Sequence, residues 1–340
     1  MTTAIKLDTA RYEVFYNRML HSVDDAKEVL RYLSGSHITR EAGEVMVAFY
    51  LPTGEAVSIA CGILMHLMNV TRIIRYMEVN NYAEDIGIYD GDAFYNNDPY
   101  IGGMHVPDAS LLSPVFYKEK LVGYVAAITH TTETGAIDTA GSSPRATEFC
   151  HDGIHFPVVK IIERGKPKRD VYNILVRAVR APVGMQIDLS ARIAALERAK
   201  LGIKEVIDDF GVEFFEAATR QLADDAVKET RAKFKQFRPG IYRHRCYCDT
   251  AGVVVGDKLA IIEVQLEFTE EGELFVKVPV TSPQARCFNN CYTPAIEATV
   301  FYTLLVHVLY DTRWNYDINV VHQSTPNSKL MRLYYYHCVQ

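Results

Sequence analysis

Leu121-Val-Gly-Tyr-Val-Ala-Ala-Ile-Thr-His130 is a continuous apolar run that ends in a threonine and a histidine. Such a run is typical of a buried strand, and we predict one from Leu121 to Ile128 with His130 at its end. Upstream, His105-Val-Pro-Asp108 carries an imidazole and a carboxylate three positions apart. Imidazole nitrogens and a carboxylate oxygen suit a divalent metal, so His105, Asp108 and His130 form a candidate metal site. Taken singly, each histidine fits a hydrogen-bonded structural role at least as well.

The segments before this strand predict a helix, a hairpin and a second helix. Apolar residues recur with a helical period from Thr9 to Leu33 and again from Ile63 to Asn80. Between them, a strand from Val45 to Leu51 turns at Pro52-Thr-Gly-Glu55 towards a returning strand around Val57-Ser-Ile59. Glu44 lies at the start of the first strand. We choose it as an additional carboxylate ligand, although an ordinary surface acid is the simpler interpretation of Glu44 alone.

Two stretches rich in Gly, Asn, Asp, Thr and Pro predict long ordered loops. They run from Ile86 to Pro114, between short strands, and from Thr131 to Ser143. Long loops in compact domains commonly carry functional groups. Within the first, Asp98 precedes a proline; it either supports the ligands from a second layer or caps a turn. His151 and His155 are candidates for acid/base catalysis near the site, and each could equally cap a turn.

The remainder of the chain predicts a change from helix to strand. Asp188 to Phe237 reads as two helices joined near Gly211. The predicted elements beyond it are strands at Ile241–Tyr247, Lys258–Phe268 and Leu274–Val280, a helix from Pro294 to Tyr310 and a strand at Ile318–Val321. We therefore expect an α+β fold with mixed sheets, long loops and packed helices, in two domains. Residues 1–237 would hold the metal site, and 238–340 a β-rich domain.

Composition and charge limit the classes of protein to which this chain can belong. The 340 residues include 36 basic and 42 acidic side chains, for a net charge of -6, without long blocks of either sign. This balance argues against nucleic acid or an anionic membrane as the main partner. The longest apolar stretch, Cys61 to Val70, is interrupted by His66 and is too short to span a membrane, and the N-terminus lacks a signal-peptide core. We expect a soluble cytoplasmic protein.

Seven cysteines form an odd set without the spacing of a disulfide framework, so they are expected to be thiols. Cys246 with Cys248 and Cys287 with Cys291 could form a second metal set, but buried thiols are common in protein cores. Nucleotide-binding motifs such as GxxxxGK[ST] and GxGxxG do not occur in the sequence. If ATP is used, another chain is expected to bind it.

Three motifs together resemble the hydantoinase B family. They are Gly91-Asp-Ala-Phe-Tyr-Asn-Asn-Asp-Pro-Tyr-Ile-Gly-Gly-Met-His-Val-Pro-Asp108, the run from Leu121 to His130, and the segment from Glu148 to Lys160. The likeness continues through Asp188-Leu-Ser-Ala-Arg192 and covers nearly the whole chain. The family includes N-methylhydantoinase B subunits, the corresponding part of 5-oxoprolinases, and the large subunits of acetone and acetophenone carboxylases. Thr129-His-Thr-Thr-Glu-Thr-Gly135 is closer to the ketone carboxylase branch.

The resemblance implies a metal-binding catalytic subunit of an ATP-dependent ketone carboxylase. Its ion, Mn in the first place with Zn or Fe as alternatives, would be held by Glu44, His105, Asp108 and His130. An actin-like, hydantoinase A-like ATPase subunit would activate the ketone and bicarbonate, and a small subunit is a further candidate partner. This chain would then join the bicarbonate-derived carboxyl group to the ketone enolate.

Two rival functions stay open. A subunit of an ATP-dependent cyclic amide hydrolase would use the metal to activate water, whereas a non-catalytic assembly subunit would need no metal. Family members usually continue for several hundred residues beyond the position of Ser328, whereas this chain stops soon afterwards. It is therefore expected to be either a naturally short subunit with a separate partner polypeptide or a fragment.

Overall fold

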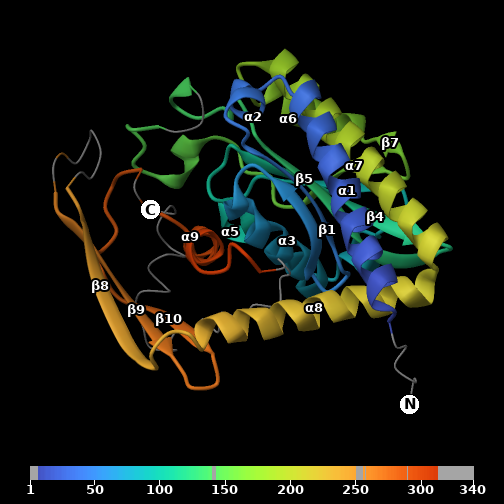
Figure 1. Ribbon diagram of the computed structural model, residues 1–340. Coiled ribbons are helices and arrows are strands. Elements are labelled where there is room, and N and C mark those ends of the chain that lie inside the picture. The colour runs from blue at the N-terminus through green and yellow to red at the C-terminus, as the bar shows by residue number, and fades with distance from the viewer. Residues whose placement is uncertain (1–6, 140–142, 250–255, 257, 289, 313–340) are drawn as a thin grey trace.

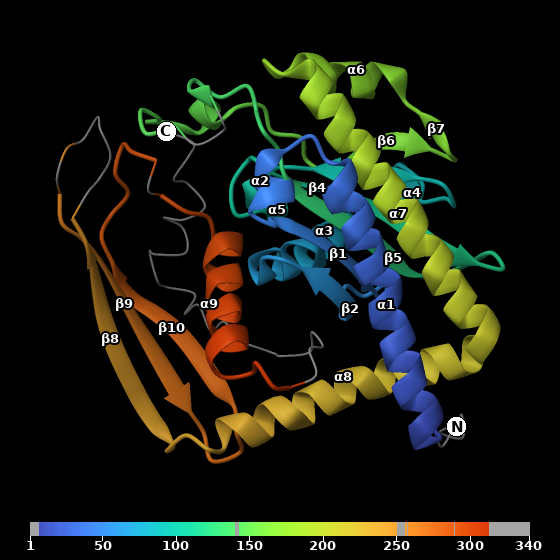
Figure 2. The same cartoon turned by 45° about the horizontal axis from the view of Figure 1, so that its top comes forward.

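The computed structural model describes residues 7–139, 143–249, 256, 258–288 and 290–312 (Figure 1). A large antiparallel sheet lies between two layers of helices, and a small sheet stands apart at the far end of the long helix α8 (Figures 1 and 2). The predicted α+β class is thereby confirmed.

The large sheet has seven strands in the order β2-β1-β5-β4-β3-β6-β7, and every neighbouring pair is antiparallel. Its strands are β1 (Val45–Tyr50), β2 (Ala56–Cys61), β3 (Ala93–Asn96), β4 (Asp108–Tyr117), β5 (Lys120–His130), β6 (Val159–Glu163) and β7 (Lys166–Pro167). β5 lies between β1 and β4 and is buried from Val122 onwards. Helices cover both faces of the sheet, so this strand is apolar without alternation.

One face of the sheet is covered by α1 (Thr9–Leu33), α7 (Pro182–Phe210) and α8 (Val212–Phe234). α1 begins after Asp8, whose side chain accepts a hydrogen bond from the Arg11 backbone N–H and so caps the helix. α1 and α7 lie side by side, and their apolar residues share one core with odd-numbered residues of β1 and β5. Gly211, with φ of 84°, joins α7 to α8 in a conformation that favours glycine.

The opposite face is covered by α3 (Leu67–Val79) and α9 (Thr293–His307). The small antiparallel sheet, in the order β10-β9-β8, adds Phe268, Leu274 and Val276 to the same core. Its strands are β8 (Gly240–Cys248), β9 (Ala260–Phe268) and β10 (Leu274–Thr281). The remaining short elements are α2 (His37–Glu41), the 3-10 turn η1 (Leu64–His66), α4 (Tyr82–Asp85), α5 (Pro99–Gly102), the 3-10 turn η3 (Phe149–Asp152) and α6 (Arg169–Arg177).

Most predicted elements are found close to their expected bounds, with one informative difference. The segment from Ile86 to Pro114, predicted as a loop, contains β3, α5 and β4 as far as Pro114. Pairing with the buried strand β5 draws Asp108 and the residues after it into the sheet, against their loop-like composition. The strand predicted at Ile318–Val321 lies outside the described residues, and the division at residues 237 and 238 stays a prediction. None of the helices in the described part has the length and apolarity to span a bilayer.

Candidate metal centre

The strand register brings three of the proposed ligands to one end of the large sheet. Asp108, the first residue of β4, pairs directly with His130, the last residue of β5. On the other side of β5, Val45 pairs with Thr129, so Glu44, one residue earlier, lies level with His130. Directly opposed residues in antiparallel strands point to the same face. This face is the one covered by α3, because Met46, Leu112 and Ile128 on it belong to the α3 core.

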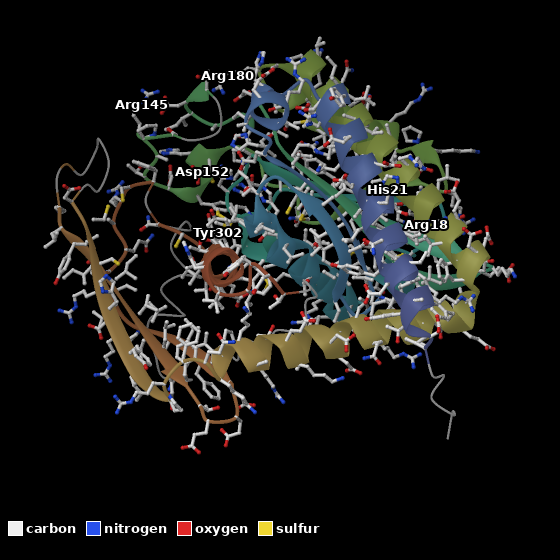
Figure 3. The ribbon with its side chains drawn as sticks, viewed as in Figure 1. Arg18, His21, Arg145, Asp152, Arg180 and Tyr302 are labelled. Atoms are coloured by element: carbon white, nitrogen blue, oxygen red, sulfur yellow. The ribbon has the colours of Figure 1, made fainter. Side chains whose placement is uncertain are left out.

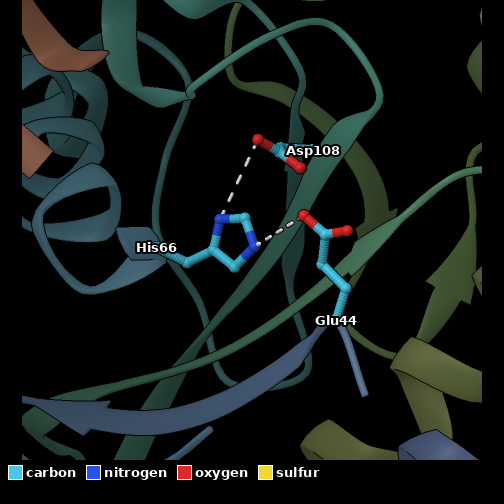
Figure 4. Close-up of side chains that lie close together, drawn as sticks. All are labelled: Glu44, His66 and Asp108. Carbon is cyan, nitrogen blue, oxygen red and sulfur yellow. Dashed lines mark ion pairs between the residues drawn. The ribbon is translucent and has the colours of Figure 1, made fainter. Parts of the chain in front are cut away.

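His66 reaches the same end of the sheet from the helical layer that covers this face. It ends the turn η1 at the start of α3, and its ring stands between two carboxylates (Figure 4). Its Nε2 is 3.7 Å from Glu44 Oε1, and its Nδ1 is 3.9 Å from Asp108 Oδ2. One ligand atom from each of Glu44, His66 and Asp108 lies within 4.8 Å of the other two. These three residues therefore form a group that could hold a metal ion.

His105 completes the cluster from the short segment before β4. Its Nδ1 lies 2.9 Å from Asp108 Oδ2, and its ring centroid is 4.9 Å from that of His130. The side chains of Asp108 and His66 are each 1% exposed, whereas that of His105 is 40% exposed. The four residues predicted from the sequence thus lie close together with His66, and His105 is more exposed than Glu44, His66 or Asp108.

Charges in the cluster stabilise the ionised form of its buried carboxylate. Burial alone would raise the pKa of Asp108, but the neighbouring His66 and His105 rings outweigh it and lower this pKa to about 2. For His105, burial lowers the pKa, and the Asp108 carboxylate reverses the effect so that the net shift is upward. Burial and the adjacent His105 ring lower the pKa of His130. The Asp108 carboxylate is therefore ionised and can serve as an anionic oxygen ligand.

The cluster also contains buried polar atoms without hydrogen-bond partners. Among the described residues, these include both ring nitrogens of His66, both carboxylate oxygens of Asp108, and Nδ1 of His105 and of His130. The close approach of His105 and Asp108 has the distance of an ion pair but not the direction of a hydrogen bond. An unsatisfied buried polar group costs about 1–3 kcal/mol, so several around one point need a further partner. A divalent ion fits this set of nitrogen and oxygen donors.

His66 was not among the residues chosen from the sequence. Its only signal is that it interrupts an apolar stretch, and a single histidine there is usually a core residue. Its two carboxylate neighbours come from β4 and from the segment before β1, so the contact depends on how α3 packs on the sheet. Neither spacing nor periodicity could have indicated it.

On the face of the sheet that is covered by α7, the end of β5 contacts a buried arginine. Arg192, on α7, is fully buried and donates hydrogen bonds to the side chain and the backbone oxygen of Thr129, the residue before His130. Burial lowers the pKa of Arg192, and Tyr95 and Asp188 partly offset this effect. The contact fixes the end of β5 from the face opposite the metal cluster.

Asp98 and His151 both act as caps in the structure. The Asp98 carboxylate accepts a hydrogen bond from the Tyr100 backbone N–H at 2.9 Å and begins α5. The His151 Nδ1 accepts one from the Thr147 backbone N–H at 3.2 Å, and its Nε2 lies 3.0 Å from Glu148. These are the capping roles weighed for both residues. A second-layer role for Asp98 and an acid/base role for His151 stay predictions.

His155 stacks on Phe149 with ring centroids 3.7 Å apart. Burial lowers the pKa of His155 to about 4, so its ring is neutral at physiological pH. Cys246 and Cys248 are exposed on β8, whereas Cys287 is buried. No cysteine belongs to a candidate metal group within the described ranges.

Comparison with known proteins identifies the family of the chain. The family described as Hydantoinase B/oxoprolinase matches residues 8–319. The acetophenone carboxylase delta subunit of Aromatoleum aromaticum is 29% identical over 311 residues, which cover 90% of this chain and 44% of that subunit. The chain thus spans less than half the length of this relative.

Two solved structures share the fold. A nucleotide-free acetone carboxylase superposes with a TM-score of 0.85 at 22% identity, covering 91% of this chain and 42% of its own. The ATP-dependent caprolactamase from Pseudomonas jessenii has a TM-score of 0.81 at 25% identity, covering 88% and 51%. From the family match over nearly its whole length, we conclude that the chain belongs to the Hydantoinase B/oxoprolinase family.

Proposed function

We propose that this chain is the metal-binding catalytic subunit of an ATP-dependent ketone carboxylase. The observation that supports this most directly is the convergence of Glu44, His66, His105, Asp108 and His130, with several of their buried donor atoms unsatisfied. The likeness to an acetophenone carboxylase subunit favours ketone carboxylation within the family. The reaction would join a bicarbonate-derived carboxyl group to the enolate of the ketone.

In this proposal Glu44 and Asp108 supply the anionic oxygen ligands, and imidazoles complete the set. Mixed imidazole and carboxylate ligands suit Mn, which we favour, and also Fe or Zn. When bound, such an ion provides a Lewis acid for the oxygen that gains negative charge during carbon-carbon bond formation. The protein holds the ligands rigidly, because they stand at the ends of paired strands and beneath α3.

ATP would be used by a partner. The sequence has no nucleotide-binding loop of the usual kinds, and the acetophenone carboxylase relative is itself one subunit of a larger enzyme. We propose an actin-like, hydantoinase A-like ATPase subunit that activates the ketone and bicarbonate, with a small subunit as the third member. The activated species would then react beside the metal ligands of this chain.

A second candidate function is favoured by one observation. The chain shares its fold with an ATP-dependent caprolactamase at a TM-score of 0.81. A cyclic amide hydrolase of that kind opens a lactam or hydantoin ring with water. The same residues would then hold an ion that supplies a Lewis acid to lower the pKa of a bound water.

Bicarbonate dependence separates the two candidates. The full chain, purified with the subunits that accompany it, would first be analysed for Mn, Fe and Zn. It would then be assayed with ATP and a ketone, with and without bicarbonate, and separately with a lactam. We expect a stoichiometric transition metal and a β-keto acid product that forms only with bicarbonate. A preparation that lacks metal, or that opens lactams without any bicarbonate-dependent product, contradicts the carboxylase proposal.

A further inference from the structure

A cavity of about 210 Å³ lies beside the metal cluster. His105 forms part of its wall, so the cavity reaches a cluster residue whose side chain is 40% exposed. The other walls come from the turn η3 with the segment before it, and from the segment that leads into α9. Asp152 stands on the η3 turn, on the same side of the molecule as α9 (Figure 3). Segments far apart in the sequence therefore enclose a space next to the cluster.

Aromatic contacts hold these walls together. Tyr100 of α5 packs edge-on against Tyr292, with ring centroids 4.3 Å apart, and its ring centroid is 5.2 Å from that of Phe149. Phe149 in turn stacks on His155. On the α9 side, the Asn290 side-chain amide donates hydrogen bonds to the carbonyl oxygens of Ala285 and Cys287 and fixes the turn. A preformed cavity of this kind is typical of small-molecule sites.

Asp152 is the carboxyl group in this cavity that is available to bind a ligand. Within the described residues its carboxyl group makes no hydrogen bond or ion pair. Burial raises its pKa to about 6, although His105 and His151 pull in the opposite direction. The neutral form of a carboxyl group donates a hydrogen bond, and the charged form accepts one. The group can therefore hold either a carbonyl oxygen or an amide N–H.

We propose that this cavity is the substrate pocket, and that it takes a small uncharged carbonyl compound held by a hydrogen bond to Asp152. The substrate class rests on the proposed function, with a ketone for the carboxylase and a lactam for the hydrolase. The cavity is small for a ligand pocket, since such pockets commonly measure about 300–1,000 Å³. It is therefore suited to one small molecule with its carbonyl group turned towards His105.

The test measures binding of acetophenone, as a neutral ketone probe, to the full chain with its accompanying subunits. Saturation-transfer difference NMR gives the dissociation constant. Ala146 is buried in the cavity wall, and Ala146→Phe fills the space; we expect affinity to fall by about tenfold or more. Asp152→Leu preserves the approximate size of the side chain but removes its hydrogen-bonding atoms, and it is expected to weaken binding by about threefold to tenfold, the value of one hydrogen bond.

Two matched controls accompany these variants. Ala83→Phe places the same ring on the exposed surface of α4, and Asp85→Leu makes the same exchange at an exposed carboxylate of that helix, outside the cavity wall. Both should keep affinity within about twofold of the unaltered chain. Thermal unfolding of each variant confirms its folding, and metal content shows that the neighbouring ligands are intact. Affinity that is unchanged in both Ala146→Phe and Asp152→Leu overturns the pocket assignment.

The outcomes also separate this inference from the proposed function. Binding that both variants weaken, in a protein that shows no bicarbonate-dependent turnover, supports the pocket and contradicts the carboxylase. Turnover with bicarbonate, together with affinity unchanged in both variants, contradicts the pocket alone. ε-Caprolactam is measured in parallel, and stronger binding of this lactam than of acetophenone would assign the pocket to the hydrolase reaction.

Discussion

Replacement of Asp108 by asparagine should abolish the stabilisation of this protein by metal ions. Asp108 is 1% exposed and faces both His66 Nδ1 and His105 Nδ1, so it lies at the centre of the cluster. Asp108→Asn keeps the shape of the side chain but removes the anionic charge and one oxygen ligand. Metal binding that depends on this oxygen must therefore weaken, while the packing around it is preserved.

The expected size of the effect follows from binding linkage and chain length. An ion at 100 times its dissociation constant stabilises the folded state by about 2.7 kcal/mol. Unfolding entropy of about 2.1 cal/mol/K per residue amounts to about 0.7 kcal/mol/K for 340 residues. The unaltered protein should therefore gain about 4 °C in Tm. If Asp108→Asn weakens binding by about a hundredfold, roughly 0.4 kcal/mol remains, and the gain falls below about 1 °C.

Differential scanning calorimetry with and without Mn²⁺, Fe²⁺ or Zn²⁺ measures this difference. Asp92→Asn is the matched control, because Asp92 is equally buried but pairs with Lys160 at 2.9 Å, away from the cluster. Loss of that buried pair should lower stability by about 3–5 kcal/mol and leave the metal-induced gain unchanged. A gain of about 4 °C that survives in Asp108→Asn would refute the reasoning, as would an unaltered protein that responds to none of the three ions.

Three further predictions concern His66 in the metal cluster, His155 beside Phe149, and Gly123 in β5. His66→Gln should weaken metal affinity by about tenfold to a hundredfold in equilibrium dialysis, and unchanged affinity would remove His66 from the site. Because burial lowers the pKa of His155 to about 4, below the value of about 6.5 in the unfolded chain, stability should fall by on the order of 2 kcal/mol as the pH drops from 6.5 to 4. His155→Phe, which keeps the stacking on Phe149, should flatten this part of the stability profile in urea titrations. Gly123→Ala should cost about 1–3 kcal/mol in urea unfolding, because a Cβ at Gly123 would lie 2.3 Å from the Tyr50 carbonyl oxygen; no loss would contradict that contact.

The sequence was most informative where local pattern and tertiary structure agree. The apolar run that ends at His130 predicts β5, and the spacing of His105 and Asp108 predicts that both can face one point. Both expectations hold because β5 is buried on both faces and pairs with β4 from its first residue. Register then aligns Glu44 with them, a consequence of pairing between segments distant in the sequence.

The sequence was least informative where function depends on packing between layers. His66 meets Glu44 and Asp108 only after α3 has covered the sheet, and no local pattern encodes that contact. Asp152 shows the same limitation, since the cavity that surrounds it is completed by the segment before α9. The loop-like composition of residues 86–114 concealed the start of β4, because strand pairing overrides local propensity.

The alignment of Glu44, His130 and Asp108 across three neighbouring strands makes the site a measure of correct folding. Side chains alternate between the faces of a sheet, so a slip of one residue in β5 would turn His130 towards α7 and away from the other two. A misregistered chain could keep much of its secondary structure and still bind no ion. Metal retention after refolding would therefore distinguish native molecules from compact misfolded ones in a mixture that circular dichroism reports as uniform.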